Sequence, residues 1–234
     1  MNAEREKRLN NQIKRTGFND LLEAFSSEDP ARTAILYEKS GTAAALSRSA
    51  FAAAVAARRD DLYEEFRSGT CLGILCDGSL TCVLTIFAAV LAGMQVVLLD
   101  ENASEDLLAA QIRQTDIDCL WGSDDDLIEE LRPCLTEGLS PQPGPTKSLS
   151  PQPDLTEDPF AQRAPIGTSD PRPILFFTSG TTSSSKAVVL TDASLMAAAY
   201  NGSCKLPLSC GDTLLCMLPL NHVFGFVCGL LWGM

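Results

Sequence analysis

The sequence predicts an α/β fold in which a mostly parallel, doubly wound sheet is flanked by helices. Short apolar runs of strand length alternate with longer stretches of helical pattern along most of the chain. This alternation is typical of parallel sheets covered by helices on both faces. Hydrophobic residues make up 45% of the 234 residues and charged residues 21%. That composition favours a globular protein with a sizeable core over a disordered chain.

The amino-terminal elements are a short helix, a hairpin and a long helix. Residues 18–25 follow an amphipathic helical pattern, and residues 33–38 have the composition of a strand. The pair Ser40-Gly41 predicts a turn into a second short strand. Ser49 predicts the N-cap of a helix that continues to about residue 66. The apolar face of that helix consists of Phe51, Val55, Leu62 and Phe66.

Strands and helices then alternate regularly. Gly93 is placed to end one helix, and Ser104 is placed to cap the next. Glu105 and Asp106 lie in the first turn of that second helix, beside the positive end of its dipole. The expected strands are 72–76, 96–99 and 117–121, and the expected helices are 80–92, 105–114 and 125–132.

A proline-rich stretch over 136–172 interrupts this alternation. It contains Leu-Ser-Pro-Gln-Pro twice, at 139–143 and 149–153. We expect an exposed, flexible insertion, with a proline-rich docking site as the alternative. The insertion separates a first α/β region, 1–135, from a segment, 173–234, that begins a second and incomplete α/β region. The elements expected in that segment are strands at 174–177, 187–190 and 213–217, and a helix from Asp192 to about Tyr200.

Charge and cysteine usage exclude several classes of function. A net charge of −12 without a basic stripe argues against a nucleic-acid partner. The nine cysteines form no Cys-x-x-Cys pair, and most of them lie in apolar runs. One histidine is available to complete a metal site. The sequence therefore predicts buried free thiols in a reducing compartment and no metal centre.

Neither a membrane span nor a signal peptide is expected. Residues 80–92 are apolar but shorter than the roughly 20 residues that a spanning helix needs. Pro219, Asn221 and His222 interrupt the apolar stretch 213–234. The first residues carry charges of both signs and lack an apolar core. We therefore expect a soluble, cytoplasmic protein.

Residues 177–191 carry the clearest functional signal. Two apolar strand-like runs enclose hydroxyl residues, Gly180 and Lys186. Backbone N–H groups and hydroxyls donate to phosphate oxygens, glycine permits close approach, and lysine supplies positive charge. A Ser/Thr/Gly linker is the alternative, although linkers seldom lie between two strands. The loop is not a Walker loop, because no glycine precedes Lys186 and no Ser or Thr follows it.

The order Thr-Ser-Gly-Thr-Thr-x-x-x-Lys at 178–186 resembles the phosphate-binding loop of the adenylate-forming (AMP-binding) superfamily, which contains acyl-CoA synthetases, peptide-synthetase adenylation domains and luciferases. Pro219-Leu-Asn-His-Val-Phe-Gly225 resembles a second landmark of that family. Segments 29–31, 73–76 and 91–94 follow its amino-terminal pattern in order. The chain is most similar to the amino-terminal part of an acyl-CoA synthetase, or acid–CoA ligase. Its expected fold is the corresponding subdomain, with the later parts of the family fold missing.

The resemblance implies a role for each residue of the two motifs. Those expected to bind the phosphates of ATP are Thr178, Ser179, Gly180, Thr181, Thr182, Ser183 and Lys186. Those expected to line the acid pocket are His222, Phe224 and Gly225. Lys186 and His222 are the catalytic candidates. Mg²⁺ would arrive with ATP, and the acyl acceptor would be CoA or the thiol of a carrier protein.

Departures from the family pattern keep other interpretations open. Ser183, Ser185 and Ala187 stand where the family usually has glycine, proline and glycine, and Asp192 stands where a histidine is common. A shortened, non-catalytic relative is the main alternative, acting as a binding module or arising from a broken gene. A peptide-synthetase-type adenylation domain is a further, less favoured interpretation. A Rossmann dinucleotide binder would need Gly-x-Gly-x-x-Gly after a strand, which the sequence lacks.

Overall fold

The computed structural model describes residues 17–66, 69–135, 173–178, 185–205, 208–209 and 211–234. The strands are β1 Thr33–Lys39, β2 Thr42–Ser47, β3 Cys71–Cys76, β4 Gln95–Asp100, β5 Cys119–Trp121, β6 Pro173–Thr178 and β7 Lys186–Thr191. The α-helices are α2 Phe18–Ser27, α3 Arg48–Glu65, α4 Leu80–Leu91, α5 Glu105–Thr115, α6 Asp125–Leu131 and α7 Asp192–Lys205. Two further segments are a 3-10 turn, η1 Arg132–Cys134, and a π-helical segment, η2 Gly225–Leu231.

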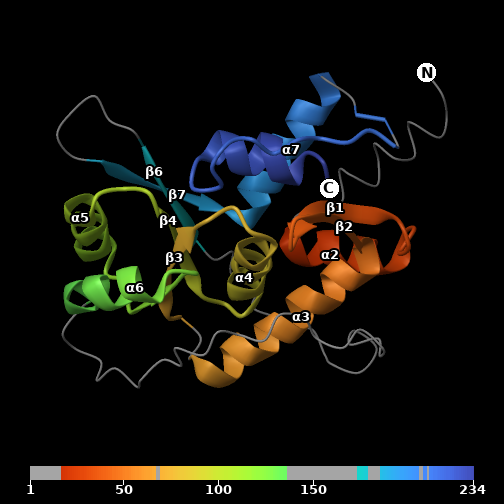
Figure 1. The fold of residues 1–234 in the computed structure, drawn as a ribbon. Coiled ribbons are helices and arrows are strands. Elements are labelled where there is room, and N and C mark those ends of the chain that lie inside the picture. The colour runs from red at the N-terminus through yellow and green to blue at the C-terminus, as the bar shows by residue number, and fades with distance from the viewer. Residues whose placement is uncertain (1–16, 67–68, 136–172, 179–184, 206–207, 210) are drawn as a thin grey trace.

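A five-stranded sheet in the order β5-β3-β4-β6-β7 organises the fold. Strands β3, β4, β5 and β6 are parallel, and β7 pairs antiparallel with β6. Helices α5 and α6 lie on one side of this sheet, and α4 lies on the other with α2 and α3 beyond it (Figure 1). The mostly parallel, helix-flanked sheet expected from the sequence is therefore confirmed. Strands β6 and β7 complete the same sheet as β3 to β5.

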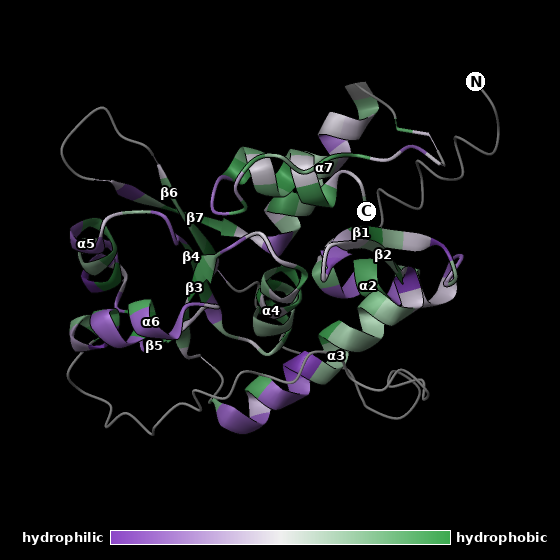
Figure 2. Ribbon diagram, viewed as in Figure 1, coloured by the Kyte–Doolittle hydropathy of each residue, from purple (hydrophilic) through white to green (hydrophobic). Residues whose placement is uncertain are grey.

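Apolar side chains form a separate cluster on each face of the sheet. The larger cluster joins α2, α3, α4, α7 and η2 to the sheet, and the smaller joins α5 and α6 to it. In the larger cluster Phe18 stacks on Phe87 with ring centroids 4.3 Å apart, and Phe176 meets Phe226 edge-on at 5.8 Å. Figure 2 shows the matching hydropathy, with apolar strands inside and polar residues on the outer end of α3. Aromatic packing of this kind ties β6 and η2 together.

Several boundaries differ from the expected ones. Ser47, not Ser49, caps α3: its hydroxyl accepts a hydrogen bond from the Ala50 N–H at 3.2 Å. The Ser49 hydroxyl instead donates to the carbonyl oxygen of Pro30 at 3.1 Å. Helix α7 continues to Lys205 rather than ending near Tyr200. Strand β5 begins at Cys119, two residues later than expected, and Ser104 occupies the N-cap position of α5 without a side-chain capping bond.

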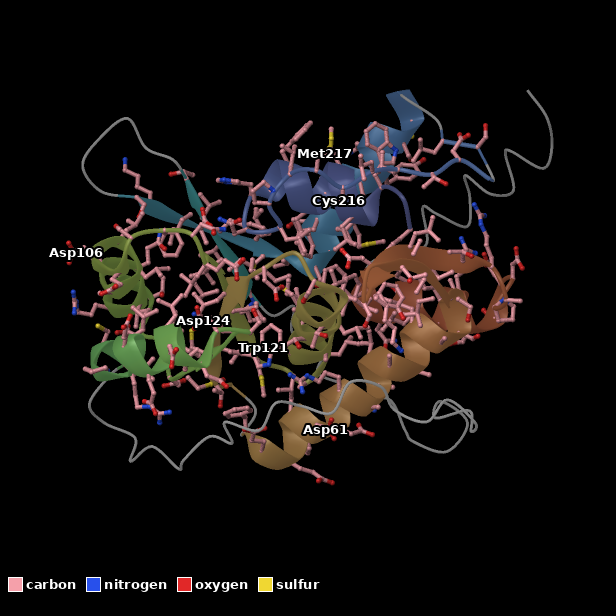
Figure 3. All side chains as sticks on the ribbon, viewed as in Figure 1. Asp61, Asp106, Trp121, Asp124, Cys216 and Met217 are labelled. Carbon is pink, nitrogen blue, oxygen red and sulfur yellow. The ribbon has the colours of Figure 1, made fainter. Side chains whose placement is uncertain are left out.

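The strand expected at 213–217 is wrong. This segment belongs to no strand of the described structure. Leu215 and Met217 are 74% and 78% exposed, and Met217 lies at the surface beside Cys216 (Figure 3). A continuous apolar run resembles a strand buried on both faces, but a strand also needs a neighbour to accept its backbone hydrogen bonds. No described residue pairs with this segment. The expected insertion at 136–172 lies outside the described residues.

Candidate active site

The β6–β7 hairpin brings Thr178 and Lys186 together. They are paired residues at the end of the antiparallel ladder, and the Thr178 hydroxyl donates to the carbonyl oxygen of Lys186 at 3.4 Å. Side chains of paired residues lie on the same face of a sheet, about 5 Å apart at Cβ. Both side chains are exposed. The two ends of the predicted phosphate loop therefore place a hydroxyl and a cation side by side.

The remaining predicted loop residues cannot be placed in this arrangement. Ser179, Gly180, Thr181, Thr182 and Ser183 all lie outside the described residues. Their assignment to phosphate binding stays a prediction from the sequence.

A tight turn presents His222 and Phe224 at the surface. The His222 N–H donates to the carbonyl oxygen of Pro219 at 3.2 Å, and the Phe226 N–H donates to that of His222 at 2.9 Å. Gly225 is required at this close approach, because an added Cβ would lie 2.3 Å from the Pro219 carbonyl oxygen. His222 is exposed, and Phe224 is 67% exposed. The chain then enters η2, whose i→i+5 pattern is a rare geometry often found at functional sites.

One cavity brings the two motifs together. It has a volume of about 440 Å³, within the range of small-molecule sites. Thr178 reaches it from the end of β6, and His222 reaches it from the turn before η2. The complete lining is Phe177, Thr178, Leu218, His222, Val223, Phe224 and Gly225. Predicted site residues from segments some forty positions apart thus converge, with Lys186 beside Thr178 but outside the lining.

The carboxyl ends of the neighbouring strands are acidic. Partial burial raises the pKa of the Glu101 carboxyl, and the negative charges of Asp77 and Asp100 raise it further. Parallel strands end at the same edge of a sheet, so these carboxylates lie on the edge at which β6 ends. Within the described ranges, His, Cys, Asp and Glu side chains form no group that could hold a metal ion. Lys186, which is paired with Thr178, carries a positive charge and so favours an anion beside these carboxylates.

Two buried polar residues near the site were missed by the sequence analysis. Asn221 is 7% exposed, precedes His222, and its Oδ1 has no hydrogen-bond partner in the described part of the chain. Gln111 of α5 is 6% exposed, and its Nε2 donates to the Ser185 hydroxyl at 3.3 Å. The available signal for Gln111 was its position between Leu108 and Ile112 on the apolar face of the helix.

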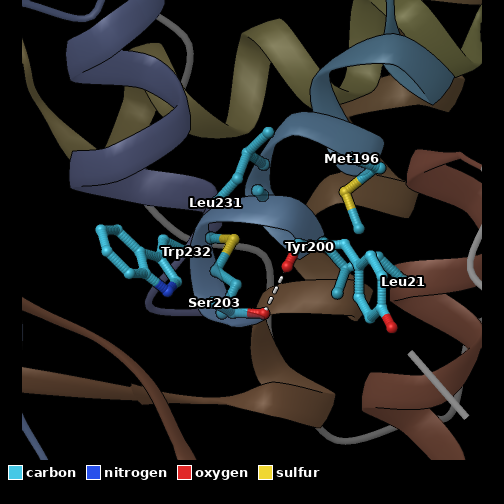
Figure 4. A pocket seen from close by; sticks show the side chains of 8 residues that line it. Leu21, Met196, Tyr200, Ser203, Leu231 and Trp232 are labelled. Atoms are coloured by element: carbon cyan, nitrogen blue, oxygen red, sulfur yellow. Dashed lines mark hydrogen bonds between the residues drawn. The ribbon is translucent and has the colours of Figure 1, made fainter. Parts of the chain in front are cut away.

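A second, smaller cavity lies away from these motifs. It measures about 50 Å³ and lies between α2, α7 and the end of η2. Figure 4 shows Leu21, Met196 and Trp232 on its wall, with the Ser203 hydroxyl donating to the Tyr200 carbonyl oxygen at 2.8 Å. Its size suits one or two water molecules rather than a nucleotide or an acid.

Comparison with known proteins identifies the family. The AMP-binding enzyme family matches residues 22–234, and the chain belongs to this family. No curated protein sequence matches the chain.

Similar solved structures show the same adenylate-forming fold. A long-chain-fatty-acid CoA ligase from Rhodopseudomonas palustris is 19% identical with a TM-score of 0.72, over 94% of this chain and 56% of that one. The O-succinylbenzoate CoA synthetase of Bacillus subtilis, in complex with AMP, is 20% identical with a TM-score of 0.67, over 91% and 52%. A fatty acyl-adenylate ligase from L. pneumophila, in complex with acyl adenylate and pyrophosphate, is 16% identical with a TM-score of 0.71, over 95% and 38%.

The chain thus spans between 38% and 56% of the length of these three proteins. Among the helices that the structure describes, none combines the length and the apolar character needed to cross a membrane.

Proposed function

We propose that this chain forms the nucleotide- and acid-binding part of an acid–thiol ligase. The complete enzyme would use ATP to activate a carboxylic acid and would then form a thioester. The observation that carries the proposal is the convergence of Thr178 and His222 on one cavity, with Lys186 paired to Thr178. Membership of the AMP-binding enzyme family supports the use of a nucleotide.

The proposed reaction has two steps. In the first, a carboxylate oxygen attacks the α-phosphorus of ATP, the bond to the β-phosphate oxygen breaks, and acyl-adenylate and pyrophosphate form. In the second, a thiol attacks the acyl carbon and AMP leaves. The thiol would belong to CoA, or alternatively to a carrier protein. Mg²⁺ would accompany ATP and offset part of its charge.

The described residues would act mainly by electrostatics and positioning. Lys186 would offset the charge that develops on the departing pyrophosphate. Thr178 would donate its single hydroxyl hydrogen to a phosphate oxygen in place of the Lys186 carbonyl oxygen that accepts it in this structure. His222 and Phe224 would hold the acid against the nucleotide, which raises the effective concentration of the two reactants. Ser179, Gly180, Thr181, Thr182 and Ser183 would complete the phosphate contacts. Gly225 would keep the turn close enough to shape the pocket.

We also propose how the chain is divided into domains and in which cellular compartment the protein works. The region 1–135 would supply most of the first subdomain, 136–172 would be an insertion, and the chain after β7 would begin the second subdomain. The cysteines of the described ranges are free thiols, but Cys204 and Cys216 are exposed, so the expectation that the thiols are buried is wrong at these two positions. A chain with this many free thiols is typical of the reducing conditions of a cytoplasm.

The test is acid-dependent exchange of radioactive pyrophosphate into ATP, with the protein expressed from its full reading frame. We expect exchange that requires one class of carboxylic acid and stops when Lys186 is replaced by alanine. A panel of short, long and aromatic acids would identify that class. Absence of exchange with every acid, in a protein that still binds ATP, would favour a non-catalytic binding module. The replacements Ser183, Ser185 and Ala187 in the loop motivate this second candidate function.

A further inference from the structure

Gln111 lies on the face of the sheet that α5 covers, and its side chain contacts Ser185, the residue before Lys186. Gln111 belongs to α5, where its neighbours Leu108 and Ile112 are almost completely buried in the smaller apolar cluster. Its Nε2 donates to the Ser185 hydroxyl at 3.3 Å. Ser185 immediately precedes Lys186, the first residue of β7. The side chain of Gln111 therefore contacts the residue that immediately precedes the proposed phosphate-binding lysine.

Burial at position 111 is energetically unfavourable for an amide side chain. Gln111 is 6% exposed, and its Oε1 has no hydrogen-bond partner among the residues that the structure describes. A buried acceptor without a partner destabilises a fold, whereas an apolar side chain of similar size avoids this cost. Leucine would thus suit the helix better than glutamine does. The contact with Ser185 is what glutamine supplies and leucine cannot.

The backbone around Lys186 is then fixed from two directions. On the strand side, Lys186 is paired with Thr178 in the antiparallel ladder of β6 and β7. On the helix side, Gln111 holds the preceding side chain. Ser185 itself lacks the ring that would restrict its backbone angle, so its position depends on such external contacts. The first contact holds the backbone of Lys186 itself, and the second holds the residue before it.

We infer that Gln111 is a positioning residue that orients Lys186 toward nucleotide phosphate through Ser185. This inference rests on the proposed ligase function. It extends the site to a helix that contributes no residue to the lining of the cavity. It also assigns a function to Ser185, which replaces the usual family proline.

Steady-state kinetics of Gln111→Leu test the inference. Loss of one hydrogen bond corresponds to a three- to tenfold effect. We expect KM for ATP to rise by about that factor, with KM for the acid unchanged and the melting temperature unchanged or higher. A purely structural residue would lower the melting temperature and affect both substrates. Gln114→Leu is the matched control, because Gln114 lies on the exposed face of the same helix.

A double-mutant cycle isolates the contact. Ser185→Ala removes the same hydrogen bond from the other side, so the double variant should behave like either single variant. Additive effects on KM for ATP would show that Gln111 acts by another route and would overturn the inference.

Hydrogen exchange separates failure of this inference from failure of the proposed function. If the wild-type protein shows no pyrophosphate exchange with any acid, the ligase proposal fails. The positioning contact is then judged by amide exchange at residues 185–187, which we expect to be faster in Gln111→Leu than in wild type. Equal exchange rates would overturn the inference whether or not the protein is a ligase.

Discussion

The Asp192 carboxylate accepts a hydrogen bond at 3.0 Å from the backbone N–H of Phe18, a residue 174 positions earlier. Phe18 begins α2, and the preceding Gly17 has no side chain to cap that helix. The other oxygen of Asp192 accepts from the Ala193 N–H at 2.8 Å, in the first turn of α7. One carboxylate thus lies at the amino-terminal ends of two helices, where their dipoles favour negative charge.

Removing this shared carboxylate should destabilise the protein. We expect Asp192→Ala to lower the free energy of unfolding by about 1–2 kcal/mol, because two helix ends lose an acceptor. Asp192→Asn should cost less, since an amide oxygen can still accept. Urea denaturation monitored by circular dichroism measures both values. Glu64→Ala, at an exposed position of α3, is the control, and an equal loss there would refute the capping role.

A side chain at Gly17 should displace the Asp192 carboxylate from its contact with Phe18. A Cβ at this position would lie 2.6 Å from Asp192 Oδ2, on the side where the carboxylate approaches Phe18. Gly17→Ala is therefore expected to lower the melting temperature, and to do so much less when combined with Asp192→Ala. Calorimetry of the single and double variants checks this. Strictly additive shifts would mean that the two residues do not interact.

Lys186→Ala should slow adenylation in the full-length enzyme. Loss of one charged group from the phosphate site is expected to reduce kcat/KM for ATP by about 10²-fold. Lys186→Arg should keep part of the activity, because the positive charge remains. Acid-dependent pyrophosphate exchange provides the rates. Lys39→Ala, at an exposed position on the β1–β2 hairpin, controls for loss of net positive charge; a Lys186→Ala rate equal to that control would remove the lysine from the mechanism.

Truncation of Phe226 should affect stability, whereas truncation of Phe224 should affect binding of the acid. Phe226 is fully buried against Phe176, so Phe226→Ala should cost about 3–5 kcal/mol of stability. Phe224 is 67% exposed at the cavity, so Phe224→Ala should change KM for the acid with little effect on stability. Denaturation curves and acid titrations of both variants test the contrast. Similar stability losses would place both rings in the core.

Stability should fall in alkaline solution because of the Cys71 thiol. Burial raises the pKa of Cys71 from 9.0 to about 11. Between these values the unfolded chain loses its proton while the folded chain retains it, so unfolding becomes more favourable as pH rises from about 9 to 11. Below pH 9 both states are protonated and the effect vanishes.

Urea titrations at several pH values measure this dependence. Cys71→Ala should lose less stability between pH 9 and 11 than wild type. Identical slopes for wild type and Cys71→Ala would contradict the assignment.

Local patterns were sufficient to predict most elements of the sheet. The runs that became β3, β4 and β6 are short, apolar and bounded by polar or glycine residues, so their buried positions follow from composition alone. The strand expected at 213–217 had the same pattern, but strand formation depends on a neighbour that the pattern cannot reveal. The antiparallel direction of β7 was not specified either, because it follows from how the hairpin closes.

The sequence could propose the motifs of the candidate site, but it could not reveal the contacts that support them. The resemblance of two motifs to the adenylate-forming family predicted that Thr178, Lys186 and His222 share a site, and the cavity is lined by the first and third of them. Gln111 and Asp192 were not predicted in their roles. Each acts through a contact between elements distant in sequence, and such contacts leave no periodic signal in the chain.

The ring of Phe18 packs against Phe87 and lies 6.3 Å from Phe226, so the first and last described helical segments share one core. On a ribosome these segments emerge at different times. At about 5–20 residues per second, roughly 10–40 s pass between the synthesis of α2 and that of η2. Until then the nascent chain exposes an aromatic surface that its later residues will cover. A pause in translation before η2 should therefore increase the binding of chaperones to the growing chain.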